Sequence, residues 1–200
     1  MAMRFAKVVS FLLGPLFVLL PIPFILVGKF TQDYSYALKW TVFSYAFILS
    51  VAIFVIIGVL LGVFSNFDVS KREQRPLLFS FCAFAMFCYL LSLFILEGPK
   101  ILFLALFAIV LGLIVIVVVN RWIKASIHVA TLTSVVFLIN IIYKGNYFLL
   151  LFLIPLLAWS RVKLKQHTPL ETVVGSLLGI VITLIVYTVS KQFFMSLIYN

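Results

Sequence analysis

ILFLALFAIVLGLIVIVVV, residues 101–119, is an unbroken apolar run long enough to cross a bilayer as one helix. It lacks the alternation of apolar and polar residues that a strand of a membrane β-barrel would show. The whole chain is 66% hydrophobic and 10% charged, with a mean hydropathy of +1.31, and a soluble surface requires more polar side chains than this. The sequence therefore predicts an integral membrane protein.

Further apolar runs lie on both sides of this segment, at residues 8–28, 42–64, 77–96, 127–143, 147–159 and 170–190. We expect an all-α fold, a polytopic bundle of seven transmembrane helices, or six if the short run 147–159 does not cross. No repeat or linker interrupts the chain, so residues 1–200 are expected to form a single integral membrane domain. We expect a multi-pass protein of the cell (plasma) membrane.

The polar stretches between the spans fall on alternate sides of the membrane, because each span reverses the side. The loops after the second, fourth and sixth spans share one face, and they read DVSKREQRP (68–76), NRWIKASIH (120–128) and SRVKLKQHTPLE (160–171). Both histidines of the chain lie in these loops. The excess of Lys and Arg on this face favours the cytoplasmic side, but some of those cations are candidate substrate ligands, so the side of the site stays open.

The side chains on this face suit the hydrolysis of a phosphate ester. Such a reaction needs a nucleophile, an acid for the leaving alkoxide and fixed positive charge around the phosphate oxygens. His167 and His128 can supply the first two. Glu171 lies one helical turn after His167 and can hold its second ring nitrogen. The candidate phosphate-binding cations are Arg75, Arg161 and Lys124.

Three motifs on this face resemble those of the type 2 phosphatidic acid phosphatase superfamily, KxxxxxxRP, PSGH and SRxxxxxHxxxD. This chain has RP at 75–76, ASIH at 125–128 and SRVKLKQHTPLE at 160–171, in the same order, and the resemblance covers about residues 68–180. The chain departs from the family at Asp68, where the family has Lys, at Ile127, where it has Gly, and at Glu171, where it has Asp.

The resemblance implies a phosphoric monoester or acid anhydride hydrolase that acts on a lipid phosphate or on a polyprenyl (isoprenoid) phosphate or diphosphate. His167 would attack phosphorus and form a phosphohistidine, Glu171 would orient it, and His128 would protonate the leaving group. The residues that would hold the phosphate are Arg75, Arg161 and Ser126, with Lys124 as an additional cation.

The expected partners are the lipid bilayer and the lipid phosphate substrate. The net charge is +10, but no basic soluble domain exists to carry a nucleic acid, so none is expected. No cluster of carboxylates is available for magnesium, and we expect neither a metal nor a cofactor. The oligomeric state stays open.

Several candidate residues also fit a purely structural role. Thr168, Pro169 and Glu171 form a helix start with a capping box, in which Glu171 would be only a cap. Ser126 fits an N-cap, and Arg161 fits a cation that reaches the lipid headgroups.

The spacing of Gly175 and Gly179, GxxxG, indicates close helix packing in the last span. At the level of the whole protein, a non-catalytic scaffold that binds lipid phosphates and a small transporter remain the alternatives to an enzyme.

Overall fold

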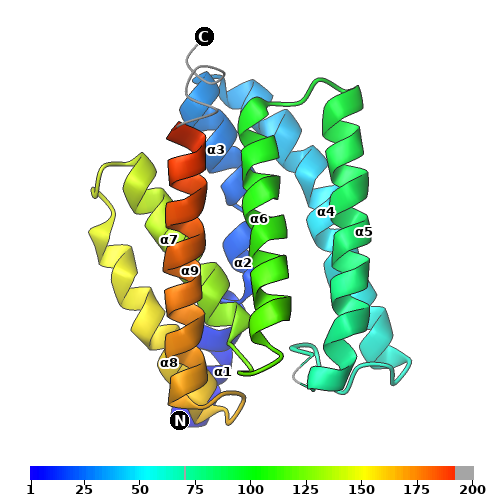
Figure 1. Ribbon diagram of the computed structural model, residues 1–200, viewed down its shortest axis with the longest axis vertical. Coiled ribbons are helices and arrows are strands. Elements are labelled where there is room, and N and C mark those ends of the chain that lie inside the picture. Colours follow the sequence, from blue (N-terminus) through cyan, green and yellow to red (C-terminus); the bar gives the residue numbers. More distant parts are fainter. Residues whose placement is uncertain (70, 192–200) are drawn as a thin grey trace. The chain divides into compact units, whose positions relative to one another are not determined.

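The computed structural model describes residues 1–69 and 71–191, and all of their regular structure is helical (Figure 1). The α-helices are α1 (Ala2–Leu12), α2 (Pro15–Leu19), α3 (Ile22–Thr31), α4 (Tyr34–Leu60), α5 (Arg75–Ile95), α6 (Lys100–Val119), α7 (Ile127–Ile142), α8 (Leu153–Lys163) and α9 (Pro169–Val189). Two short 3-10 helices, η1 (Arg72–Gln74) and η2 (Phe148–Phe152), precede α5 and α8. The predicted all-helical fold class is confirmed.

Within residues 1–69 and 71–191, five segments are long and apolar enough to cross a membrane: Ala2–Leu19, Tyr34–Leu60, Arg72–Ile95, Lys100–Val119 and Pro169–Val189. Among them, Lys100–Val119, which contains the apolar run 101–119, has the highest mean hydropathy, 3.5. Two shorter apolar helices, α3 and α7, accompany them. The chain is therefore a polytopic helical membrane protein, as predicted.

The described chain divides into two compact units. The first contains Met1–Leu19 and the described residues from Leu111 onward, and the second contains Leu20–Val110. The first unit thus holds two of the three motif segments, 120–128 and 160–171, whereas the segment 68–76 lies in the second. The single domain expected from the sequence stays a prediction.

The expected first span, residues 8–28, is wrong as one continuous helix. The chain leaves helical structure after α1, and α2 begins only at Pro15. It breaks again before α3, whose N-cap is Pro21. Proline lacks the backbone N–H of a continuing helix, and its ring clashes with the preceding turn. The boundary between the two units falls within the same apolar run, between Leu19 and Leu20.

The expected sixth run, 147–159, also differs from the observed helix. It starts as the 3-10 helix η2 and continues as α8, which runs on to Lys163. Pro155 falls in the first turn of α8, where the missing N–H would have no helical partner. Ser160 and Arg161, expected in a polar connection, therefore lie in the last turns of a helix, where regular backbone geometry fixes their directions.

The close packing indicated by GxxxG is confirmed, and the partner of α9 is α7. A Cβ added at Gly175 would lie 2.7 Å from the Ser126 carbonyl oxygen, and one at Gly179 would lie 2.8 Å from the Thr133 Cβ. The hydroxyl of Ser134 donates to the Gly179 carbonyl at 3.0 Å. Only glycine permits such an approach, so these two positions set the distance between α7 and α9.

The core of the first unit joins α7 to α8. Its buried centre consists of Val129, Leu132 and Val136 from α7 and Leu157 from α8, with α2 contributing Val18 at its edge. Figure 1 shows α1, the end of α8 and the start of α9 at the same end of this unit. The polar stretches 120–128 and 160–171 are thereby held at that end.

In the second unit, α4 packs against α3 and α5. The side chain of Asp33 accepts a hydrogen bond from the Tyr36 backbone N–H at 2.9 Å and caps α4, which explains why this helix starts before the expected residue 42. Ser44 of α4 and Tyr89 of α5 share a hydrogen bond of 2.7 Å between their hydroxyls. This bond satisfies two polar groups within an apolar helix pair.

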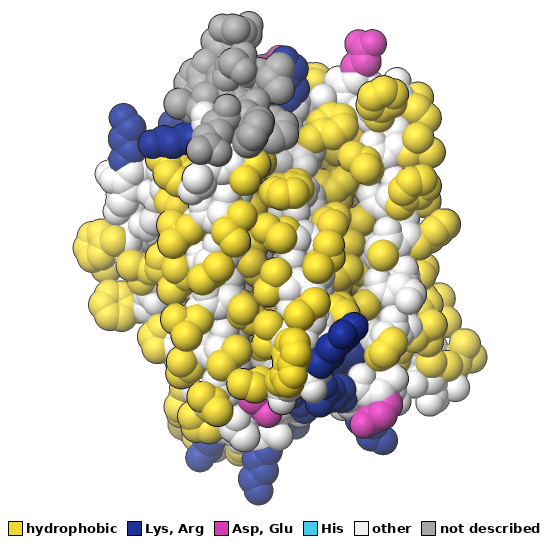
Figure 2. All heavy atoms as spheres, in the orientation of Figure 1, with side chains coloured by type: hydrophobic (Ala, Val, Ile, Leu, Met, Phe, Trp, Pro, Cys, Tyr) yellow, Lys and Arg dark blue, Asp and Glu magenta, His cyan; other side chains and the backbone are white. Residues whose placement is uncertain are grey.

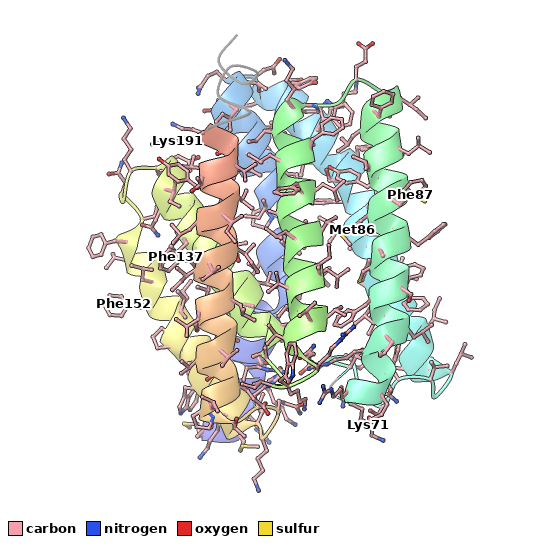
Figure 3. The ribbon with its side chains drawn as sticks, in the orientation of Figure 1. Lys71, Met86, Phe87, Phe137, Phe152 and Lys191 are labelled. Carbon is pink, nitrogen blue, oxygen red and sulfur yellow. The ribbon has the colours of Figure 1, made fainter. Side chains whose placement is uncertain are left out.

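The outer surfaces of the helices are apolar, as a lipid environment requires. Hydrophobic side chains cover the face of α9 turned to the viewer in Figure 2, and Lys and Arg side chains gather beyond its lower end. Phe152 and Phe87 project away from η2 and α5, and they are 69% and 63% exposed (Figure 3). Large exposed aromatic side chains at these positions fit contact with lipid.

Candidate active site

His167 lies in the tight turn between α8 and α9 and is only 8% exposed. Its Nδ1 lies 2.8 Å from the Glu171 Oε2. A carboxylate oxygen accepts hydrogen bonds, so Nδ1 is the donor and the lone pair resides on Nε2. The predicted contact between these two side chains is therefore present, with the tautomer that a nucleophilic imidazole requires.

Glu171 is also the third residue of a capping box. Its Oε2 accepts from the Thr168 backbone N–H at 3.3 Å, and its own backbone N–H donates to the Thr168 Oγ1 at 3.3 Å. The interpretation of Glu171 as only a cap is thus too narrow, because the same oxygen contacts both the cap residue and the imidazole. The start of α9 fixes the carboxylate, and the carboxylate in turn fixes His167.

Burial lowers the pKa of His167 from 6.5 to about 4. The hydrogen bond and charge of Glu171 oppose this shift, whereas the nearby charges of Arg161 and Lys124 reinforce it. At neutral pH the imidazole is therefore uncharged and its Nε2 lone pair is available for attack. Two cations close to a neutral imidazole also form an environment that favours an anion.

Two backbone-anchored hydrogen bonds join the segments 120–128 and 160–171. The Ser126 backbone N–H donates to the Glu171 carbonyl at 3.1 Å, and the Lys124 Nζ donates to the Gln166 carbonyl at 3.3 Å. The second and third motifs, far apart in sequence, therefore lie together. Lys124 is placed beside the turn that contains His167, as its effect on the pKa of His167 also indicates.

Ser126 occupies the N-cap position of α7, but its side chain makes no capping bond. The residue is fully buried, and within the described part of the chain its Oγ has no hydrogen-bond partner. Ser126 as a routine side-chain cap is therefore wrong. A buried hydroxyl without a partner is costly, and a bound phosphate oxygen could satisfy it.

Arg161 is 2% exposed, so the alternative of a cation that reaches the lipid headgroups is also wrong. Its Nη1 donates to the Ser10 Oγ at 2.7 Å. The neighbouring Ser160 hydroxyl, also buried, donates to the Ala6 carbonyl at 2.6 Å. The nearby Lys163 and Lys165 are exposed, in contrast to Arg161.

The contribution of α1 to this cluster was not predicted from the sequence. Ala6 and Ser10 are four residues apart, one helical turn, and both are buried. A small residue and a serine at this spacing on the first helix are the only sequence signal for the contact. That signal is too common to single out these two residues in advance.

His128 lies in the first turn of α7 and is partly buried. Its Nε2 would lie 3.5 Å from a Cβ added at Gly14, which brings the break between α1 and α2 next to the imidazole. Its predicted role as an acid stays a prediction.

Arg75 is buried at the start of α5 in the second unit, and its predicted phosphate contact stays a prediction as well. Among the described residues, no group of three or more His, Cys, Asp or Glu side chains forms a possible metal site.

Comparison with known proteins agrees with the geometry. Residues 120–195 match the family model of the PAP2 superfamily, and this segment contains the second and third motifs. No curated protein and no solved structure matches the chain. The predicted resemblance to the phosphatidic acid phosphatases is confirmed for this segment, and it supports a phosphatase-type activity. The segment with Arg75 lies before the matched residues.

Proposed function

We propose that this protein hydrolyses a lipid phosphate or a polyprenyl phosphate or diphosphate through a phosphohistidine intermediate, without a metal. The observation that carries the proposal is the 2.8 Å contact between the His167 Nδ1 and the Glu171 Oε2, in a site where the pKa of His167 is lowered to about 4. An imidazole that is neutral and held at one nitrogen is prepared for nucleophilic attack by the other.

In the first step, the His167 Nε2 attacks phosphorus and forms a P–N bond while the bond from phosphorus to the leaving oxygen breaks. His128 donates a proton to that oxygen, so the lipid leaves as an alcohol or, from a diphosphate, as a monophosphate. The imidazole becomes positively charged as the P–N bond forms. The carboxylate of Glu171 stabilises this charge through Nδ1–H.

In the second step, water attacks the phosphohistidine, and His128 takes a proton from the water. The P–N bond breaks, inorganic phosphate forms and His167 returns to its neutral state. The positive charges of Arg161 and Lys124 stabilise the negative charge on the phosphate oxygens. The Ser126 hydroxyl, buried and without a described partner, completes the proposed phosphate contacts.

The position of the site supports a lipid substrate. His167 lies two residues before the apolar helix α9, whose segment Pro169–Val189 has a mean hydropathy of 2.3. A phosphate headgroup at this helix end would meet the histidine while an acyl or isoprenoid tail remains among apolar side chains. We place this activity in the cell (plasma) membrane.

The test is phosphate release in detergent from a panel of lipid phosphates and polyprenyl diphosphates, with EDTA present. We expect the wild type to release phosphate and His167→Ala to release none, because the nucleophile is lost. Lys163→Ala is the matched control, since this exposed cation lies near the same turn and has no proposed role. It should retain activity.

Two results would contradict the proposal. Activity that disappears with EDTA and returns with a divalent cation would exclude the metal-independent reaction. A wild type that binds these lipids without releasing phosphate would favour a scaffold instead.

A further inference from the structure

The N-terminal helix α1 contacts the third motif through two buried hydrogen bonds. The Arg161 Nη1 donates to the Ser10 Oγ at 2.7 Å, and the Ser160 Oγ donates to the Ala6 carbonyl at 2.6 Å. Ser10 and Arg161 are 6% and 2% exposed, and Ala6 and Ser160 are fully buried. Water therefore does not compete for either bond, and both are stronger than their counterparts on a surface.

The same N-terminal segment also approaches the second motif. Gly14, which follows α1, is the residue whose added Cβ would lie 3.5 Å from the His128 Nε2. The segment from Ala6 to Gly14 therefore borders both the candidate phosphate ligand and the candidate acid. It lies outside residues 120–195, which match the family model.

We propose that Ser10 is a positioning residue that fixes the guanidinium of Arg161 for phosphate binding, so that α1 is a required part of the active site. This inference rests on the proposed phosphatase function. The guanidinium is a planar fork of five N–H donors, so a bond at one Nη1 fixes the plane and directs the other donors. Loss of that bond would remove one constraint on the orientation of the guanidinium, and phosphate binding would have to supply the ordering that Ser10 now provides.

The bond from Ser160 to Ala6 supports this arrangement. It holds α1 in one register along α8, which places Ser10 opposite Arg161 rather than one turn away. Ser160 and Arg161 are adjacent in the chain, and Ala6 and Ser10 are one turn apart in α1. Two neighbouring residues of α8 thus bind two successive turns of α1.

The experiment is a double-mutant cycle with Ser10→Ala, Arg161→Ala and the double variant in the full-length protein. Two quantities are measured: kcat/KM for phosphate release, and the Kd for inorganic phosphate by calorimetry. We expect Ser10→Ala to lower kcat/KM and to weaken phosphate binding about tenfold, which corresponds to about 1.4 kcal/mol. In the Arg161→Ala background, the second substitution should have no further effect on either quantity.

The controls separate positioning from folding. Ser92→Ala removes a serine hydroxyl that bonds a carbonyl within α5, and it should leave both quantities unchanged. Ser10→Thr keeps the acceptor and should restore binding. Ser10→Cys keeps the side-chain size but offers a weak acceptor. Ser10→Cys should therefore weaken phosphate binding as Ser10→Ala does. It tests the positioning role if Ser10→Ala does not fold.

Additive effects of Ser10→Ala and Arg161→Ala, or unchanged phosphate binding in Ser10→Ala and Ser10→Cys, would overturn the positioning role. The phosphate-binding measurement also separates this inference from the proposed function. If the wild type releases no phosphate from any lipid but Ser10→Ala still weakens phosphate binding with the expected coupling to Arg161, the proposed enzyme is wrong and the positioning role stands.

Discussion

Glu171→Gln separates the two tasks of this side chain, because glutamine can still cap α9 but carries no charge. Its amide oxygen can accept from the Thr168 backbone N–H, as the Glu171 Oε2 does at 3.3 Å. It can also accept from the His167 Nδ1, where Oε2 now lies at 2.8 Å. What the substitution removes is the negative charge beside the imidazole, which becomes positive when phosphorus is bound.

The magnitude follows from the kind of hydrogen bond that changes. A bond to a charged group contributes about 1.5–3 kcal/mol, and a neutral bond about 0.5–1.5 kcal/mol. The difference of about 1–2 kcal/mol applies to the transition state, and each 1.36 kcal/mol is about tenfold in rate. We expect kcat to fall about tenfold while KM stays nearly constant, because the neutral imidazole of the ground state depends less on the charge.

The assay is rapid-quench measurement of phosphohistidine formation in a single turnover, with Thr168→Ala as the control. Thr168→Ala removes the hydroxyl that accepts from the Glu171 backbone N–H and caps α9, but it keeps the Glu171 carboxylate. It should cost about 1 kcal/mol of stability and leave the rate of phosphohistidine formation nearly unchanged. A Glu171→Gln enzyme as fast as the wild type would refute the role of the negative charge. Glu171 would then act on His167 through its hydrogen bond alone.

Three further predictions concern the same unit. Lys124→Met removes a cation that lowers the pKa of His167, so the acid limb of the plot of kcat/KM against pH should move to higher pH. Lys163→Met is the control and should leave this limb in place. An unmoved limb in Lys124→Met would show that Lys124 does not act on His167. Because the pKa of His167 falls from 6.5 unfolded to about 4 folded, the stability linked to its neutral form is present above about 6.5 and is lost as the pH falls toward about 4. Between pH 6.5 and about 4, the melting temperature in detergent should therefore fall less for His167→Asn than for the wild type. Equal falls would argue against the lowered pKa. Gly175→Ala should unfold at a lower temperature, because its Cβ would lie 2.7 Å from the carbonyl oxygen of Ser126, the N-cap residue of α7. Gly112→Ala, whose Cβ would lie 3.8 Å from its nearest neighbour, should keep the melting temperature of the wild type. Equal melting temperatures of the two variants would contradict the close packing.

The sequence by itself determined the fold class and the contact between His167 and Glu171 in the candidate site. In lipid, the backbone N–H and C=O groups of a long apolar run must form hydrogen bonds with each other, which an α-helix allows within a single segment. A helical bundle therefore followed from composition and length. His167 and Glu171 are four residues apart at a helix start, and local backbone geometry alone brings their side chains together. The GxxxG spacing in α9 likewise indicated close helix packing, although it did not identify α7 as the partner helix.

The helix boundaries and the contacts between helices could not be predicted from the local hydropathy pattern. Pro15 and Pro21 break a run whose hydropathy is continuous, so a window of apolar residues could not show the break. The backbone bond from Ser126 to Glu171 joins α7 to α9 through groups that every residue possesses, and no side-chain pattern encodes it.

The contact of Arg161 with Ser10 joins residues 151 positions apart in the chain. A serine in an apolar helix is common, and the contact with Arg161 forms only when α1 packs on α8 and excludes water from both groups. The sequence therefore determined which residues can do chemistry, because that depends on side-chain type and local spacing. Only the tertiary structure decided which residues hold them in place, because burial and orientation arise from helices that meet across the whole chain.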